Sequence, residues 1–252
     1  MRRARVLVLL LLAGAGLAAC DVPGFESETG RTEQGQEVFD LWRAEVAAAF
    51  VIGLFVWGLI FYAAIRYRRR SDAVPGQRQY VLPIEVTYTI VPIVIVAVIF
   101  GVSYGVQRDV DDVAPDPAVV IEVTGFQWQW QFHYVDEDIT VTGLPDEPPT
   151  MVLPVDATIR LKLSSHDVIH SFYVPDFLYK RDVIPGVDNE IDVDVTDEGT
   201  YSGACAEFCG LDHARMTFTV EAVSADEFDD WVAQQQSDSE SATTTTTTGA
   251  AE

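Results

Sequence analysis

Two long apolar segments dominate the first half of the chain. Residues 44–65 are apolar apart from Glu45, and residues 83–106 form a second run that contains Pro92. Each has about the twenty residues that a helix needs to cross a bilayer, and neither shows the polar face of a soluble core helix. The pattern predicts a hairpin of two transmembrane helices over residues 44–106. Pro92 is tolerable there because neighbouring helices can satisfy the freed carbonyl.

The second half of the chain alternates between short β-branched runs and turn residues. Such runs, without convincing helices between them, predict a sandwich or barrel over residues 119–233. Aromatic residues at alternate positions from Phe126 to Tyr134 would share one face of a strand and fill a core. A short closing helix follows Ser224, where apolar residues recur at helical spacing. The predicted strands are 119–125, 139–142, 158–163, 190–195 and 216–223.

The remaining segments have the composition of signals, linkers and tails. Residues 1–19 have early arginines, an apolar run and a lipobox, which predicts a lipoprotein-type signal peptide and an acylated Cys20. Residues 20–43 form a polar, external lead-in and residues 107–118 an acidic linker. Residues 234–252 include the threonine run 243–248, and their low complexity predicts disorder.

Arginines between the two apolar segments set the expected orientation. Arg66, Arg68, Arg69, Arg70 and Arg78 lie in this short loop, and basic loops stay on the cytoplasmic side. Both termini are therefore expected outside the cell, with the hairpin in the plasma membrane of a prokaryote. The lipobox independently predicts that the amino terminus is outside.

The exported part carries the negative charge. The chain has a net charge of −23, and positions 107–252 hold 30 acidic residues against 6 basic ones. Such a field repels nucleic acid and attracts basic proteins in a salt-dependent way. Adaptation to high salt is an alternative explanation for the acidity.

One segment near the end concentrates metal-binding side chains. Cys205, Cys209, His213 and Met216 lie within one loop, and His170 stands in an upstream Asp-Val-Ile-His-Ser segment. Thiolate, thioether and imidazole together favour copper, with zinc as the second choice. A buried disulfide or two inert thiols are the structural alternative. His133 and His166 are expected to be hydrogen-bonded or exposed instead.

Both motifs resemble those of subunit II of the haem-copper cytochrome c oxidases. The shared patterns are Cys-x-Glu-x-Cys-Gly-x-x-His-x-x-Met and Asp-Val-Ile-His-Ser. The resemblance implies a cupredoxin-like sandwich with a dinuclear copper centre, CuA, bridged by Cys205 and Cys209. It gives one copper to His170 and Met216, and the other to His213 and the carbonyl of Glu207. It further implies that the Glu207 side chain helps to bind magnesium at the junction with subunit I.

The resemblance also assigns two residues outside the copper loop. Trp128, in Gly-Phe-Gln-Trp-Gln-Trp, matches the position where electrons from cytochrome c enter, although Gln129 stands where an aromatic residue is frequent. Glu85 matches the mouth of a proton channel into subunit I, although Tyr88 replaces the usual tryptophan. By its position alone, Glu85 fits a carboxylate that stabilises the first turn of a helix.

The expected function is therefore electron acceptance for a proton-pumping terminal oxidase. Electrons would come from cytochrome c and pass to haem in subunit I, where oxygen is reduced to water. A metal-free subunit of a quinol oxidase, a membrane-tethered copper carrier, and a nitric oxide reductase subunit are the competing functions. The expected partners are subunit I, other oxidase subunits, cytochrome c and membrane lipid.

Overall fold

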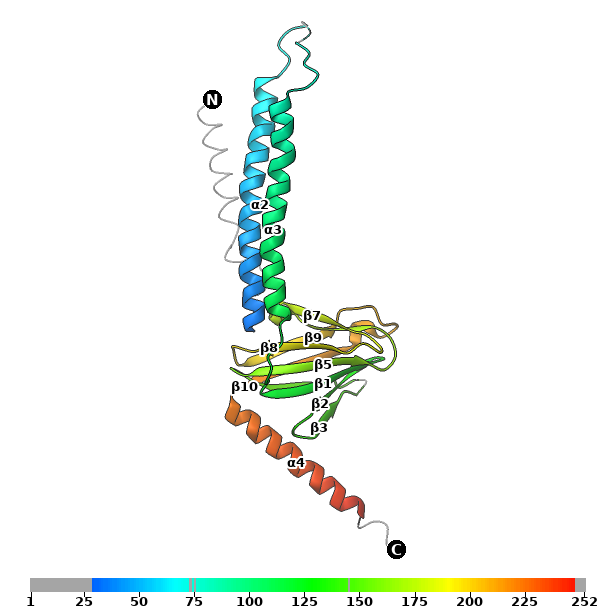
Figure 1. Ribbon diagram of the computed structural model, residues 1–252. Helices are drawn as coiled ribbons and strands as arrows, with labels where there is room; N and C mark the ends of the chain where they lie inside the picture. The colour runs from blue at the N-terminus through cyan, green and yellow to red at the C-terminus, as the bar shows by residue number, and fades with distance from the viewer. Residues whose placement is uncertain (1–28, 73, 75, 145, 248–252) are drawn as a thin grey trace, which may run out of the picture.

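The computed structural model describes residues 29–72, 74, 76–144 and 146–247 (Figure 1). The predicted signal peptide and Cys20 lie outside the described residues. Within them, a helical hairpin stands on one side of a β-sandwich, and a further helix leaves the sandwich on the side that faces away from the hairpin. This arrangement confirms the predicted fold class, a membrane-anchored all-β protein.

The hairpin consists of α2 (Glu33–Arg66) and α3 (Leu82–Asp111), which run antiparallel side by side. Their apolar side chains are exposed in the chain by itself, as expected of helices that face lipid or other subunits. Between the helices, the Ser103 hydroxyl donates to Glu45 Oε1 at 2.8 Å.

Helix α2 begins well before the predicted residue 44, so residues 33–43 are helical rather than part of a lead-in. Thr32 caps the helix, because its Oγ1 accepts the Gly35 N–H at 2.9 Å. Helix α3 likewise continues to Asp111 and shortens the predicted acidic linker. Apolar composition marks the membrane-spanning part of a helix, but caps decide where the helix itself starts.

The sandwich has two five-stranded sheets, ordered β3-β2-β1-β5-β8 and β4-β10-β9-β6-β7. Neighbours are antiparallel except for the pairs β1–β5 and β4–β10. The first sheet contains β1 (Val119–Phe126), β2 (Gln129–Tyr134), β3 (Ile139–Thr142), β5 (Thr158–Ser165) and β8 (Asn189–Asp194). The second contains β4 (Thr150–Pro154), β6 (His170–Val174), β7 (Tyr179–Val183), β9 (Gly199–Cys205) and β10 (Thr217–Val223).

Aromatic side chains from both sheets fill the core, but the aromatic segment is not the single strand that alternation predicts. The chain turns at Gln127 and Trp128 and pairs Phe126 with Gln129. Only Trp130, Phe132 and Tyr134 share the fully buried face. Alternation identified the buried face of β2, but it could not locate the turn.

The last helix, α4 (Ala225–Thr247), extends into the segment for which composition predicts disorder. Phe228 and Trp231 pack beside Tyr134, with ring centroids 6.3 and 4.9 Å away. The Gln236 side chain donates to the Glu137 carbonyl at 3.2 Å. Ala233 and the three glutamines after it favour helix and let it continue past its packed first turns, whereas the serines and threonines beyond them are weaker helix formers.

Candidate metal centre

The predicted metal ligands come from neighbouring strands of the second sheet. His170 is the first residue of β6, Cys205 is the last residue of β9, and Cys209 and His213 follow in the loop before β10. Two backbone hydrogen bonds fix this loop: Cys205 N donates to the Met216 carbonyl, and Ala206 N to that of Ser171. Regular strands thereby hold residues that are distant in sequence at one end of the sandwich.

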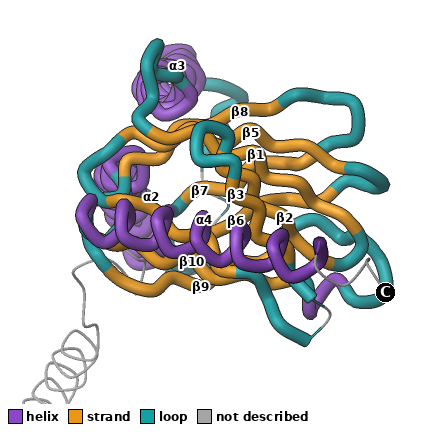
Figure 2. Tube along the Cα trace, turned by 90° about the horizontal axis from the view of Figure 1, so that it is seen from below, coloured by secondary structure: helices purple, strands orange, loops and turns teal. Residues whose placement is uncertain are grey.

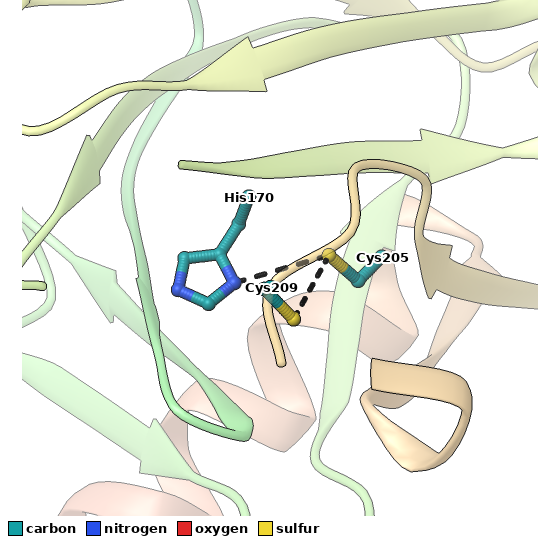
Figure 3. A group of neighbouring side chains, drawn as sticks. All are labelled: His170, Cys205 and Cys209. Carbon is teal, nitrogen blue, oxygen red and sulfur yellow. Dashed lines mark hydrogen bonds between the residues drawn. The ribbon is translucent and has the colours of Figure 1, made fainter. Parts of the chain in front are cut away.

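The two sulfur atoms lie 3.8 Å apart, and Figure 3 shows His170 beside Cys205. Further nitrogen, sulfur and oxygen donors surround the pair. His170 Nδ1 is 3.8 Å from Cys205 Sγ, and His213 Nδ1 is 3.6 Å from Cys209 Sγ. The Met216 sulfur lies 3.8 Å from Cys209 Sγ, and the Glu207 carbonyl oxygen 3.2 Å from Cys205 Sγ. The two ligands expected for one copper, His170 and Met216, therefore lie beside different sulfur atoms. The same holds for His213 and the Glu207 carbonyl, the ligands expected for the other.

Burial and hydrogen bonding give the two thiols different acidities. Burial raises the pKa of the Cys205 thiol, but hydrogen bonds from His170 and the backbone outweigh burial and leave that pKa below its usual value. Burial and the adjacent Cys205 charge both raise the pKa of the Cys209 thiol. Cys205 is therefore the more acidic of the two thiols, and metal binding, which requires thiolates, must remove the proton that Cys209 holds more strongly.

The donor set fits copper. The ligand atoms of His170, Cys205 and Cys209 all lie within 4.8 Å of one another, and all three residues are buried. Met216 is fully buried beside them and presents a thioether, which a structural zinc site does not use. The sulfur atoms are separate thiols, not a disulfide.

Comparison with known families identifies the chain. A family model for the transmembrane domain of cytochrome c oxidase subunit II matches residues 26–106, and one for the periplasmic domain matches residues 144–223. The chain belongs to the cytochrome c oxidase subunit II family. In this family the periplasmic domain binds the CuA centre, and the cluster of one imidazole and two thiols is consistent with copper.

Curated subunit II proteins match most of the chain. The probable cytochrome c oxidase subunit 2 of Streptomyces avermitilis is 36% identical over 260 residues, covering 87% of this chain and 82% of its own. Cytochrome c oxidase subunit 2 of Mycobacterium bovis is 30% identical over 292 residues, covering 92% and 80%. The crystal structure of the periplasmic domain of subunit II from Bradyrhizobium japonicum is 33% identical, with a TM-score of 0.46 over 50% of this chain and 99% of that one.

Trp128 of this subunit II lies directly beside the loop that carries Cys205 and Cys209. Its indole Nε1 donates to the Cys209 carbonyl at 3.2 Å, and the Gln127 amide donates to the same oxygen at 2.7 Å. Trp130 instead points into the core, where its ring lies 6.2 Å from that of His170. The two tryptophans of the motif therefore occupy different environments.

The other singled-out residues differ in their surroundings. Glu85 is in the first turn of α3, where its Oε1 accepts the Val81 N–H at 3.1 Å. His133 is hydrogen-bonded to Thr140 at 3.0 Å, and His166 is exposed. Glu207 is exposed although its carbonyl oxygen faces Cys205.

Asp167 is a site residue that the sequence-based prediction missed. Its Oδ1 lies 2.9 Å from His170 Nε2, and its Oδ2 accepts the Gln127 N–H at 2.7 Å. Burial raises the pKa of Asp167, but hydrogen bonds from His170 and two backbone amides outweigh burial and lower it. An outer carboxylate of this kind fixes the ring of a ligating histidine. Its position three residues before His170 was the available signal.

Proposed function

We propose that this chain is the electron-accepting subunit of a proton-pumping terminal oxidase. It would take electrons from cytochrome c at a dinuclear copper centre and deliver them to haem in subunit I, where oxygen is reduced to water. The observation that carries the proposal is the pair of buried thiols 3.8 Å apart, with an imidazole close to each. Membership of the subunit II family supports the oxidase reaction at the family level.

In this proposal, six residues hold the copper pair. Cys205 and Cys209 would supply thiolates to both metals, His170 and Met216 would complete one ligand set, and His213 with the Glu207 carbonyl would complete the other. When bound, the dinuclear centre supplies a one-electron redox couple whose charge is shared across both thiolates. The strands on either side keep the ligands in place in both redox states, which limits reorganisation during electron transfer.

Trp128 is the proposed point where electrons reach the protein. Its ring packs against the core, and its indole nitrogen contacts the carbonyl of the copper ligand Cys209. A donor that docks over this ring would therefore be one side chain away from the ligand loop. The acidic exported domain favours a basic cytochrome c, through attraction that weakens as salt is added.

Two further roles concern the contact with subunit I. We propose that Glu85 lies at the mouth of a proton channel and that the exposed Glu207 side chain helps to bind magnesium. Glu85 already satisfies a backbone donor at the start of α3, so its channel role requires a separate test. Glu85→Gln preserves a hydrogen-bond acceptor, so helix α3 should persist while turnover falls, as measured by oxygen consumption in the assembled enzyme.

We place the protein in the plasma membrane of a prokaryote with the copper domain outside. The arginine-bearing loop between α2 and α3 supports this orientation. Acylation of Cys20 would add a second anchor at the outer surface.

Three competing functions differ in what they require of the metal site and its partners. A quinol oxidase subunit would need no metal ligands, and a copper carrier would need no membrane hairpin or partner haem. A nitric oxide reductase subunit would share the copper site but not oxygen consumption. The complete ligand cluster on a transmembrane hairpin favours the oxidase over the first two, and the similarity to cytochrome c oxidase subunit 2 proteins favours it over the third.

The test is to purify the complete chain with its partner subunits and to measure metal content, electron paramagnetic resonance and oxygen consumption. Paired copper with a mixed-valence signal, together with haem and cytochrome c-dependent oxygen consumption, is expected. Mononuclear copper without haem would indicate a carrier, and a metal-free but active complex would indicate a quinol oxidase. Zinc in place of copper would also refute the proposal.

A further inference from the structure

The first turn of α2 packs directly against the backbone of the sandwich. Gly35 is buried there, and a Cβ atom added to it would lie 2.5 Å from the Phe177 carbonyl oxygen. Real Cβ atoms do not approach a carbonyl so closely, so only glycine allows this contact. Phe177 belongs to η1 (Pro175–Phe177), the short 3-10 turn that follows β6.

Hydrogen bonds attach the same turn to two segments of the sandwich. Arg31 N donates to the Asp176 carbonyl at 2.8 Å, and Thr196 N donates to the Arg31 carbonyl at 3.0 Å. The Gln34 amide bonds Asp194 twice, donating to its carboxylate and accepting its backbone N–H at 3.1 Å. We refer to residues 31–35 as the docking turn.

The other helix of the hairpin is attached separately. Asp111, the last residue of α3, accepts the Tyr179 hydroxyl at 3.0 Å and lies 3.2 Å from Arg181. Beyond it, Ala114 N donates to Asp192 at 2.6 Å, and Arg160 donates to the Ala114 carbonyl. Figures 1 and 2 show the outer ends of both helices against the same side of the sandwich. Two independent attachments remove the hinge that a single flexible linker would provide.

The docking turn contacts the segment that follows β6, the strand whose first residue is the proposed copper ligand His170. Strand β6 begins at His170 and leads into η1, on which Gly35 rests. We propose that the docking turn is a positioning element that holds the copper domain at a fixed height and tilt on the hairpin. Electrons then leave the site across a constant distance, without movement of the domain. The proposal rests on the proposed function, since it concerns electron transfer from the same site.

The decisive variant is Gly35→Ala in the complete oxidase. Alanine favours helix more than glycine does, so any loss must come from the atoms that the added Cβ would meet rather than from helix propensity. These are the Phe177 carbonyl oxygen and, at 3.0 and 3.1 Å, Thr32 Oγ1 and Gly30 Cα. Two control variants make the same change where an added Cβ meets no atom within 4 Å. Gly53→Ala lies in the same helix, and Gly76→Ala lies in the loop between the helices. Gln34→Ala provides a milder second variant that removes both bonds to Asp194.

The main readout is the rate of internal electron transfer after photoreduction of the copper site, measured at increasing solvent viscosity. In the parent enzyme and the two glycine controls, the rate should not depend on viscosity. In Gly35→Ala it should fall several-fold and become viscosity-dependent, with the copper resonance signal unchanged. Small misplacements of reacting groups can cost up to about 10²-fold in rate. Hydrogen exchange at Asp194 and Thr196, whose amides bond the docking turn, should accelerate in the same variant.

The outcomes separate this proposal from the proposed function. A viscosity-dependent rate in the parent enzyme would overturn it, and so would unchanged rates and exchange in both Gly35→Ala and Gln34→Ala. If Gly35→Ala does not assemble, Gln34→Ala decides by the same two measurements. Absence of paired copper in the parent enzyme would refute the proposed function, while hydrogen exchange would still report whether the docking turn holds the domain.

Discussion

Removal of the Asp192 carboxylate tests how strongly a buried ion pair supports the sandwich. Asp192 and Arg160 face each other across β8 and β5, and their side chains are 4% and 11% exposed. Loss of one partner from a buried pair costs about 3–5 kcal/mol, because the other charge stays buried without compensation. Arg160 keeps the Ala114 carbonyl and Glu190 at 3.7 Å, so we expect about 3 kcal/mol for Asp192→Ala.

The assay is thermal unfolding of the full chain in detergent, followed by tryptophan fluorescence with Trp130 as the buried reporter. For a domain of roughly 100 residues, each kcal/mol shifts the Tm by about 4–8 °C, so a decrease of about 12–24 °C is expected for about 3 kcal/mol. Asp146→Ala is the matched control. It breaks an exposed pair with Arg215, with side chains 85% and 64% exposed, and such pairs contribute about 0–1 kcal/mol.

A double variant identifies the cause of the loss. Arg160→Met with Asp192→Leu removes both charges and fills the same space, so most of the lost stability should return. A double variant as unstable as Asp192→Ala would show that the orphaned charge is not the cause. Equal Tm shifts for Asp192→Ala and Asp146→Ala would refute the assignment of a strong buried pair.

Three further predictions concern the metal site and the junction of hairpin and sandwich. Met216→Leu should retain the fold and the copper but shift its reduction potential; an unchanged potential in a redox titration would remove Met216 from the ligands. Trp128→Phe should slow electron transfer from cytochrome c while leaving internal transfer to haem unchanged, and equal slowing of both steps in stopped-flow measurements would contradict its role. Burial raises the pKa of Tyr179 from 10.0 to about 12, with a smaller lowering effect from the Arg181 charge and a smaller raising effect from Asp111. Because the folded pKa is the higher one, the resulting stability is complete below pH 10 and lost as the pH rises towards 12. The unfolding temperature should therefore fall over that interval, and less so in Tyr179→Phe.

The sequence by itself determined the parts of this protein that depend on local pattern. Apolar length predicted the hairpin of α2 and α3, because a bilayer imposes a fixed span on any helix that crosses it. Alternation and β-branched residues predicted five of the strands, including β3 (Ile139–Thr142) at its observed bounds. Ligand chemistry and spacing predicted Cys205, Cys209, His213 and Met216 as one group, since they share a loop.

Only the tertiary structure decided which distant residues meet. His170 reaches Cys205 because β6 and β9 are neighbours in one sheet, and strand order is not encoded in local pattern. Asp167 contacts His170 locally, but it meets Gln127 only because β5 and β1, the strands that these two residues follow, are paired. The docking turn was read as part of a polar lead-in, since polar residues that bond another segment look the same in sequence as polar residues that face water. The close approach at Gly35 becomes visible only when the partner backbone is in place.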